Sequence, residues 1–188
     1  MSVIPIVAYG DPVLKEKAQP IDQDYPGLGQ LIEDMWETMY KASGVGLAAP
    51  QVGKSIRLFV IDATPFAEEE PELDGFKKVF INAVILEESG DLWLFNEGCL
   101  SFPELREDIR RQSRIRIKYM DENFQEHEDE YSGLTARIIQ HEYDHIEGIL
   151  MVDRISPLKK TLLRKKLGNI SKGLVSTDYP MKFPLRKR

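Results

Sequence analysis

The chain has 188 residues and a mass of 21.6 kDa, the size of one domain with its own core. Its 42% hydrophobic and 30% charged residues exclude a disordered chain, and no apolar run approaches the ~18 residues of a membrane span. Residues 155–188 carry a charge of +9, whereas residues 1–154 carry −15. This asymmetry predicts either contact with a polyanion or a solvated tail.

Two further features of the sequence predict the cellular compartment of the protein. The N-terminal residues match neither a signal peptide nor a transit peptide, and the only cysteine, Cys99, cannot form an internal disulfide. We therefore expect a cytoplasmic protein that contacts neither a membrane nor DNA.

In chain order, the first predicted element is a helix. After Pro26, apolar residues recur at helical spacing from 28 to 39, and glycines at 44 and 46 end the pattern. Strands are then expected over 56–61, 79–86, 92–95, 114–119 and, after a turn at 121–123, over 124–131.

Two helices follow the strands, over 134–147 and 157–167. Strands followed by helices predict an α+β fold, with antiparallel sheets packed around the helix at 134–147 and a C-terminal helix. We expect a catalytic domain over 1–167 and a basic tail over 168–188. Because the motifs described below end at 145, we expect hydrolysis to survive a cut after Asp153.

The helix at 134–147 carries H-E-x-x-H at residues 141–145. Side chains four residues apart share a helix face, so His141 and His145 can bind one metal ion. Glu142 lies about 100° further round the helix, where it can reach a ligand of that ion. This is the arrangement of a metal-activated water beside a general base, although a histidine pair without metal is the alternative.

A third metal ligand must come from elsewhere. One metalloprotease pattern needs histidine where Met151 stands, and another needs a downstream glutamate, but none follows Glu147. Asp153 and Asp178 are weak candidates, and so is His127, which lies in a Glu-rich alternating segment typical of an exposed strand. Elimination favours Cys99, whose thiolate suits a borderline-soft metal, against the alternative of an inert buried cysteine.

Three segments together resemble bacterial peptide deformylases: Gly44-Val45-Gly46-Leu47-Ala48-Ala49-Pro50-Gln51, Glu97-Gly98-Cys99-Leu100-Ser101 and Gln140-His141-Glu142-Tyr143-Asp144-His145. Their order and separation also match, and the resemblance covers roughly residues 3–167. Ile146 stands where leucine is usual. The resemblance implies a hydrolase that removes the formyl group from the N-terminal formyl-methionine of newly synthesised proteins.

The resemblance also implies roles for particular residues. Cys99, His141 and His145 hold the metal, which is Fe²⁺ natively and can be replaced by Zn²⁺, Ni²⁺ or Co²⁺. Glu142 is the general acid/base for a metal-bound water. The Gln51 side-chain amide and the Leu100 backbone N–H form the oxyanion hole.

Substrate contacts are expected around Val45. A peptide can pair as an added strand with the main chain of 44–46, including Gly46. Val45, Leu134 and Ile138 either line a pocket for the methionine side chain or belong to the ordinary core.

Three further residues are expected to support the site. Glu97 and Arg106 would fix the loop around Cys99 through a charge-assisted hydrogen bond. Asp144 would orient a neighbouring group.

Two other functions remain open at this point. A general zinc peptidase shares H-E-x-x-H, and a closed structural site could recruit His127 as a fourth ligand. The partners we expect are formyl-methionyl nascent peptides and the ribosome. The basic C-terminal helix would contact the ribosome, with Leu158, Leu162 and Leu163 packed on the body and the cations facing outward.

Overall fold

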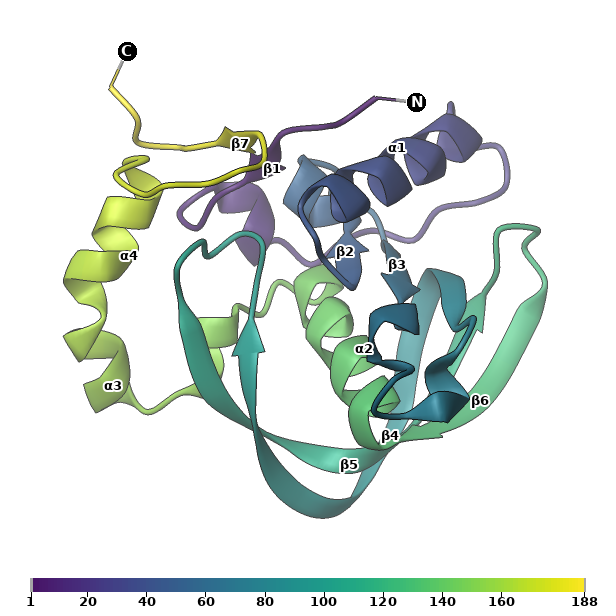
Figure 1. Ribbon diagram of the computed structural model, residues 1–188. Helices are drawn as coiled ribbons and strands as arrows, with labels where there is room; N and C mark the ends of the chain where they lie inside the picture. The colour runs from purple at the N-terminus through teal and green to yellow at the C-terminus, as the bar shows by residue number, and fades with distance from the viewer. Residues whose placement is uncertain (1, 188) are drawn as a thin grey trace.

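The computed structural model describes residues 2–187, which form a five-stranded sheet, a two-stranded sheet and four α-helices (Figure 1). The strands are β1 (Ile6–Val7), β2 (Gly46–Ala48), β3 (Leu58–Asp62), β4 (Lys77–Gly98), β5 (Arg106–Met120), β6 (Glu126–Ser132) and β7 (Met181–Lys182). The helices are α1 (Leu28–Lys41), α2 (Gly133–Ile146), α3 (Pro157–Leu162) and α4 (Arg164–Ser171). Within residues 2–187, no helix is both long and apolar enough to cross a bilayer.

The larger sheet is antiparallel in the order β2-β3-β4-β5-β6, as the α+β prediction requires. The two strands expected at 79–86 and 92–95 are one strand, β4, whose pairing with β5 contains register shifts between Ile81 and Leu92. Bulges bend a strand and increase its twist. The β4–β5 hairpin consequently curves beneath α2 and brings its closing loop, residues 99–105, back towards the middle of the molecule (Figure 1).

Helix α2 lies at the centre of the molecule (Figure 1), and most of its residues are therefore buried. Leu134, Ile138 and Ile139 pack with buried residues of β3, β4 and β5. At its C-terminal end the buried Arg57 donates to the Ile146 carbonyl (3.3 Å), one of the oxygens that a helix end leaves unpaired. Gly148, with a φ of +71°, then turns the chain away. Helix α2, which carries H-E-x-x-H, is thus held in place by packing along its side and by Arg57 at its C-terminal end.

The C-terminal region differs from the expectation in two ways. The single helix expected at 157–167 is two helices, α3 and α4, divided at Leu163. Leu158 and Leu162, expected to attach it to the body, are 72% and 75% exposed, whereas Leu163 does pack on the third core cluster. The expectation was wrong for these two leucines because α3, only six residues long, turns them to solvent.

Residues beyond 167 are also part of the packed structure. The expected boundary between 167 and 168 falls inside α4, where Leu167 and Ile170 are buried in the third core cluster. Strand β7 pairs in parallel with β1, a contact that two-residue strands give no sequence pattern to predict. A cut after Asp153 would remove these buried groups, so the structure argues against the expectation that hydrolysis survives that cut.

Candidate active site

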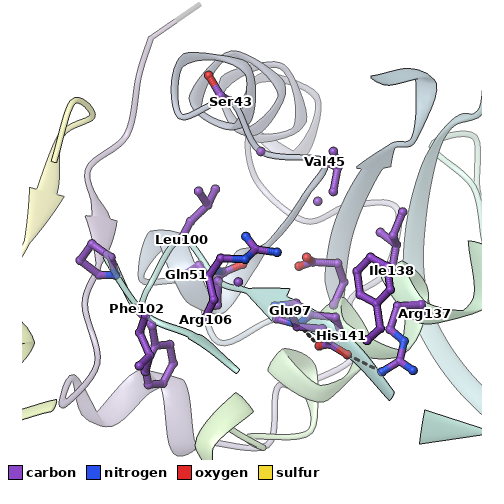
Figure 2. A pocket seen from close by; sticks show the side chains of 18 of the residues that line it. Ser43, Val45, Gln51, Glu97, Leu100, Phe102, Arg106, Arg137, Ile138 and His141 are labelled. Carbon is purple, nitrogen blue, oxygen red and sulfur yellow. Dashed lines mark hydrogen bonds and ion pairs between the residues drawn. The ribbon is translucent and has the colours of Figure 1, made fainter. Parts of the chain in front are cut away.

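A cavity of about 490 Å³ opens beside α2, between β2 and the loop that closes the β4–β5 hairpin (Figure 2). Nine of the ten residues expected at the site line it: Val45, Gly46, Gln51, Cys99, Leu100, Leu134, Ile138, His141 and Glu142. His145 is buried behind this lining, 3.4 Å from the Cys99 sulfur through its Nε2. The structure therefore brings together all ten residues that were expected from the sequence.

Cys99, His141 and His145 form a group of potential metal ligands. One donor atom from each lies within 4.8 Å of the other two. Bonds of about 2.3 Å to sulfur and 2.0–2.1 Å to nitrogen, at a tetrahedral angle, would place two such donors about 3.5 Å apart. The Cys99–His145 separation of 3.4 Å is close to this value. The donor set and its spacing fit a divalent cation.

The orientation of His141 is set by Glu97. Its Nδ1 lies 2.8 Å from Glu97 Oε1, which leaves Nε2 for the ion (Figure 2). Burial alone would raise the pKa of Glu97, but hydrogen bonds from His141 and Arg111 hold it well below the usual range. Glu97 therefore stays a carboxylate, which fixes the histidine tautomer.

Glu97 is held by a different arginine from the one expected. Arg111 donates to both its carboxylate oxygens (2.8 and 3.0 Å), and Arg137 adds a third contact at 2.7 Å. Arg106 instead donates to Asn96. The pairing of Gly98 with Arg106 explains this outcome, because it places Arg106 on the strand face opposite to that of Glu97.

Asp144 takes part in the same buried network. It accepts from Arg111 at 2.9 Å and from Arg154, so Arg111 joins Asp144 to Glu97 and hence to His141. Sequence reasoning missed Arg111 and Arg137. Arg111 has a detectable signal, since it shares its strand face with Ile109, Ile115 and Ile117.

Glu142 is 5% exposed, and its Oε2 has no hydrogen-bond partner among the described residues. Burial raises the pKa of its carboxyl group to about 7. The Glu142 side chain lies directly against Gly46, where an added Cβ would be 2.5 Å from Glu142 Oε1. Glycine at this position is what leaves room for the carboxylate.

Gln51 is 1% exposed and has a defined amide orientation. Its Oε1 accepts from the Ala48 N–H at 2.9 Å, so Nε2 points the other way, 3.3 Å from Ser101 Oγ and 3.6 Å from Cys99 Sγ. An N–H donor is thereby directed at the ligand group. Leu100 follows Cys99 in the same loop and lies opposite Gly44, where an added Cβ would meet its side chain at 2.8 Å.

The fold and this site together define an α+β hydrolase with a Cys/His/His ligand group and a buried carboxylate. Comparison with known proteins specifies it further: the family model described as polypeptide deformylase matches residues 3–161, and the chain belongs to that family. It is accordingly an enzyme, a hydrolase that removes formyl groups from nascent peptides.

Individual relatives align with this chain over nearly the whole length of both sequences. The chain is 58% identical to a peptide deformylase of Christiangramia forsetii, over 99% of this chain and 98% of the relative, and 54% identical to one of Flavobacterium psychrophilum, over 99% and 100%. Among solved structures, peptide deformylase from Thermotoga maritima superposes with a TM-score of 0.75 at 43% identity, covering 84% of this chain and 100% of that one. Peptide deformylase from Legionella pneumophila superposes with a TM-score of 0.79 at 37% identity, covering 92% of this chain and 98% of that one.

Proposed function

We propose that Cys99, His141 and His145 hold Fe²⁺ in the cell and accept Zn²⁺, Ni²⁺ or Co²⁺ in its place. The observation that carries this proposal is the grouping of the three donor atoms within 4.8 Å. Without a cation, burial opposes protonation of His141, but hydrogen bonds with Cys99 and Glu97 raise its pKa well above the usual value. A cation would replace that proton. When bound, it acts as a Lewis acid that acidifies water and polarises the formyl group.

Glu142 moves the proton in this proposal. It takes a proton from the attacking water and returns it to the departing amine, work typically worth about 10²–10⁴-fold in rate. Its buried, unpartnered Oε2 is free for this exchange, and a pKa of about 7 suits both directions of transfer near neutral pH. A neighbouring cation would lower that value and favour the base form.

The Gln51 amide and the Leu100 N–H stabilise the developing oxyanion. The Ala48 N–H fixes the Gln51 amide in advance, so no reorganisation is needed when charge appears on the formyl oxygen. A single donor of this kind is worth about 10²–10³ in rate.

The peptide substrate pairs with β2. This strand is at the edge of the larger sheet, with β3 on one side only. The Gly44 N–H already donates to the Met39 carbonyl, and the Val45 carbonyl accepts from the Asp62 N–H, so the peptide would pair with the other main-chain groups of 44–46. Val45, Leu134 and Ile138 line the cavity and form the pocket for the methionine side chain. The formyl hydrogen is the smallest acyl substituent, and a close-fitting site would exclude an acetyl group by steric clash.

The basic C-terminal helices bind the ribosome, and the enzyme acts in the cytoplasm on emerging chains. Lys159 and Lys160 pair with Glu107 and Asp153, whereas Arg164, Lys165 and Lys166 are exposed. These three cations are the better candidates for phosphate contacts. Each phosphate neutralised gives about one unit of slope in log affinity against log salt.

Metal analysis of anaerobically purified protein, combined with hydrolysis assays, tests the central proposal. We expect one equivalent of divalent metal, dominated by iron, and cleavage of formyl-Met-Ala but not of acetyl-Met-Ala. Cleavage of the unmodified dipeptide Met-Ala would instead support a general peptidase. Protein without bound metal that still cleaves formyl-Met-Ala would contradict the proposal.

A separate experiment tests ribosome binding. The double variant Lys165→Glu/Lys166→Glu alters two exposed side chains and leaves the buried residues of α4 intact. We expect weaker binding in cosedimentation and a salt slope reduced by about two units between roughly 50 and 200 mM. Unchanged binding, or binding insensitive to salt, would leave these residues a role in solubility only.

A further inference from the structure

The segment after α4 returns across the molecule and lies beside the N-terminal strand β1 (Figure 1). The Ile6 N–H donates to the Pro180 carbonyl (3.0 Å), and the Ala8 N–H donates to the Lys182 carbonyl (2.9 Å). The Leu185 N–H reaches back to the Ser171 carbonyl at 2.9 Å. The C-terminal segment is therefore tied at both ends, to β1 and to α4.

Tyr179 immediately precedes this pairing and lies in the wall of the active-site cavity. Its ring is partly buried against the first core cluster. Its hydroxyl donates a 2.8 Å hydrogen bond to the Leu100 carbonyl, across 79 residues of sequence. A residue of the C-terminal segment thus contacts the loop that bears Cys99.

That loop is a reverse turn over 99–102, closed by a 2.9 Å hydrogen bond from the Phe102 N–H to the Cys99 carbonyl. The Cys99 carbonyl and the Leu100 N–H share one planar peptide unit, so this bond also sets the direction of the N–H. The Ser101 carbonyl accepts from the Tyr9 N–H at 2.9 Å. The Phe102 carbonyl accepts from the Leu105 N–H at 3.2 Å, so main-chain donors hold three of the turn's four carbonyls.

The Leu100 carbonyl belongs to the central peptide unit of the turn, the unit whose flip separates the two commonest turn types. Among the hydrogen bonds of residues 2–187, the donor to this carbonyl is the Tyr179 hydroxyl. Without it, the central unit would be held less firmly, so the Phe102–Cys99 hydrogen bond that closes the turn would open more often. The directions of Cys99 and of the Leu100 N–H, which that bond sets, would then vary.

We propose that Tyr179 is a positioning residue: its hydroxyl holds the central peptide unit of the 99–102 turn and so keeps the Cys99 thiol and the Leu100 N–H directed at the cavity. This inference rests on the proposed role of the Leu100 N–H in stabilising the oxyanion. It assigns a part in the reaction to the C-terminal segment, which lies outside the three sequence motifs.

Tyr179→Phe removes the hydroxyl and keeps the ring. A matched control is Tyr40→Phe, which removes a phenol hydrogen bond of 2.6 Å to Asp62 outside the cavity. For formyl-Met-Ala we expect Tyr179→Phe to lower kcat about three- to tenfold, which corresponds to the usual net free energy of one hydrogen bond. KM should stay within twofold of the wild-type value. Metal content and the thermal unfolding midpoint should match those of Tyr40→Phe, whose kcat should equal that of wild type.

Amide hydrogen exchange gives a readout that is independent of activity. The Phe102 N–H closes the turn, so its exchange, followed by NMR, should accelerate about three- to tenfold in Tyr179→Phe and stay unchanged in Tyr40→Phe. An unchanged kcat in Tyr179→Phe would overturn the inference. So would a raised KM at constant kcat, which would mean that the hydroxyl contacts substrate. Failure of the proposed function would appear differently, as wild-type protein that does not hydrolyse formyl-Met-Ala.

Discussion

Replacing Gly46 by alanine tests how closely the site is built around Glu142. Gly46 has no left-handed backbone conformation, so alanine is compatible with strand β2 itself. The obstacle is the carboxylate: the new Cβ would lie 2.5 Å from Glu142 Oε1, 2.7 Å from its Cδ and 2.8 Å from its Cγ. Restoring ordinary contact requires the carboxylate to move by roughly 1 Å, a displacement that can cost 10²-fold in rate.

We therefore expect Gly46→Ala to keep its metal and to lose about 10²-fold in kcat/KM for formyl-Met-Ala, measured by release of formate. Overpacking would add about 1–3 kcal/mol of destabilisation, which thermal unfolding would detect. Gly168→Ala is the matched control, since an added Cβ there meets nothing within 4 Å. If Gly46→Ala stays within threefold of wild type, then the position of the Glu142 carboxylate does not limit the reaction.

Three further predictions concern the metal ligands and Glu142. Cys99→Ser should bind metal more weakly in competition with a chelator, because a hydroxyl is a poorer donor than a thiolate; full occupancy would place the third ligand elsewhere. The Fe²⁺ form should lose activity in air while a Ni²⁺ form persists, since ferrous iron and its thiolate ligand can both be oxidised; equal half-lives would contradict this. In metal-free protein, burial raises the pKa of Glu142 from 4.5 to about 7, so the folded state binds more protons than the unfolded state between these values. Wild type should then lose about 3 kcal/mol of unfolding free energy relative to Glu142→Gln as the pH rises from 4.5 to 7. If the unfolding free energies of the two proteins instead change in parallel with pH, the pKa of Glu142 is not raised.

Much of the candidate site could be predicted because its information is local. The spacing of His141 and His145 places both on one helix face whatever the surrounding fold. The scarcity of other suitable residues left Cys99 as the third ligand. The helices α1 and α2 were also predictable, since their apolar residues recur at helical spacing.

Other features depend on contacts that no local pattern encodes. The partner of Glu97 is decided by the register of the β4–β5 hairpin, which directs Arg111 inward and Arg106 towards Asn96. The role of Tyr179 requires the C-terminal segment to return to β1, through a two-residue pairing. Such short, distant pairings carry no periodicity, and in the sequence the segment looks like a basic tail.

The most direct test of the central claim is the variant Glu142→Ala, assayed for metal content and for turnover of formyl-Met-Ala in the same preparation. The three proposed ligands remain in this variant, and the proton carrier is removed. The account predicts that metal binding stays stoichiometric while kcat falls by at least ~10². Near-wild-type turnover would show that Glu142 does not carry the proton, and loss of the metal would show that it belongs to the ligand set instead.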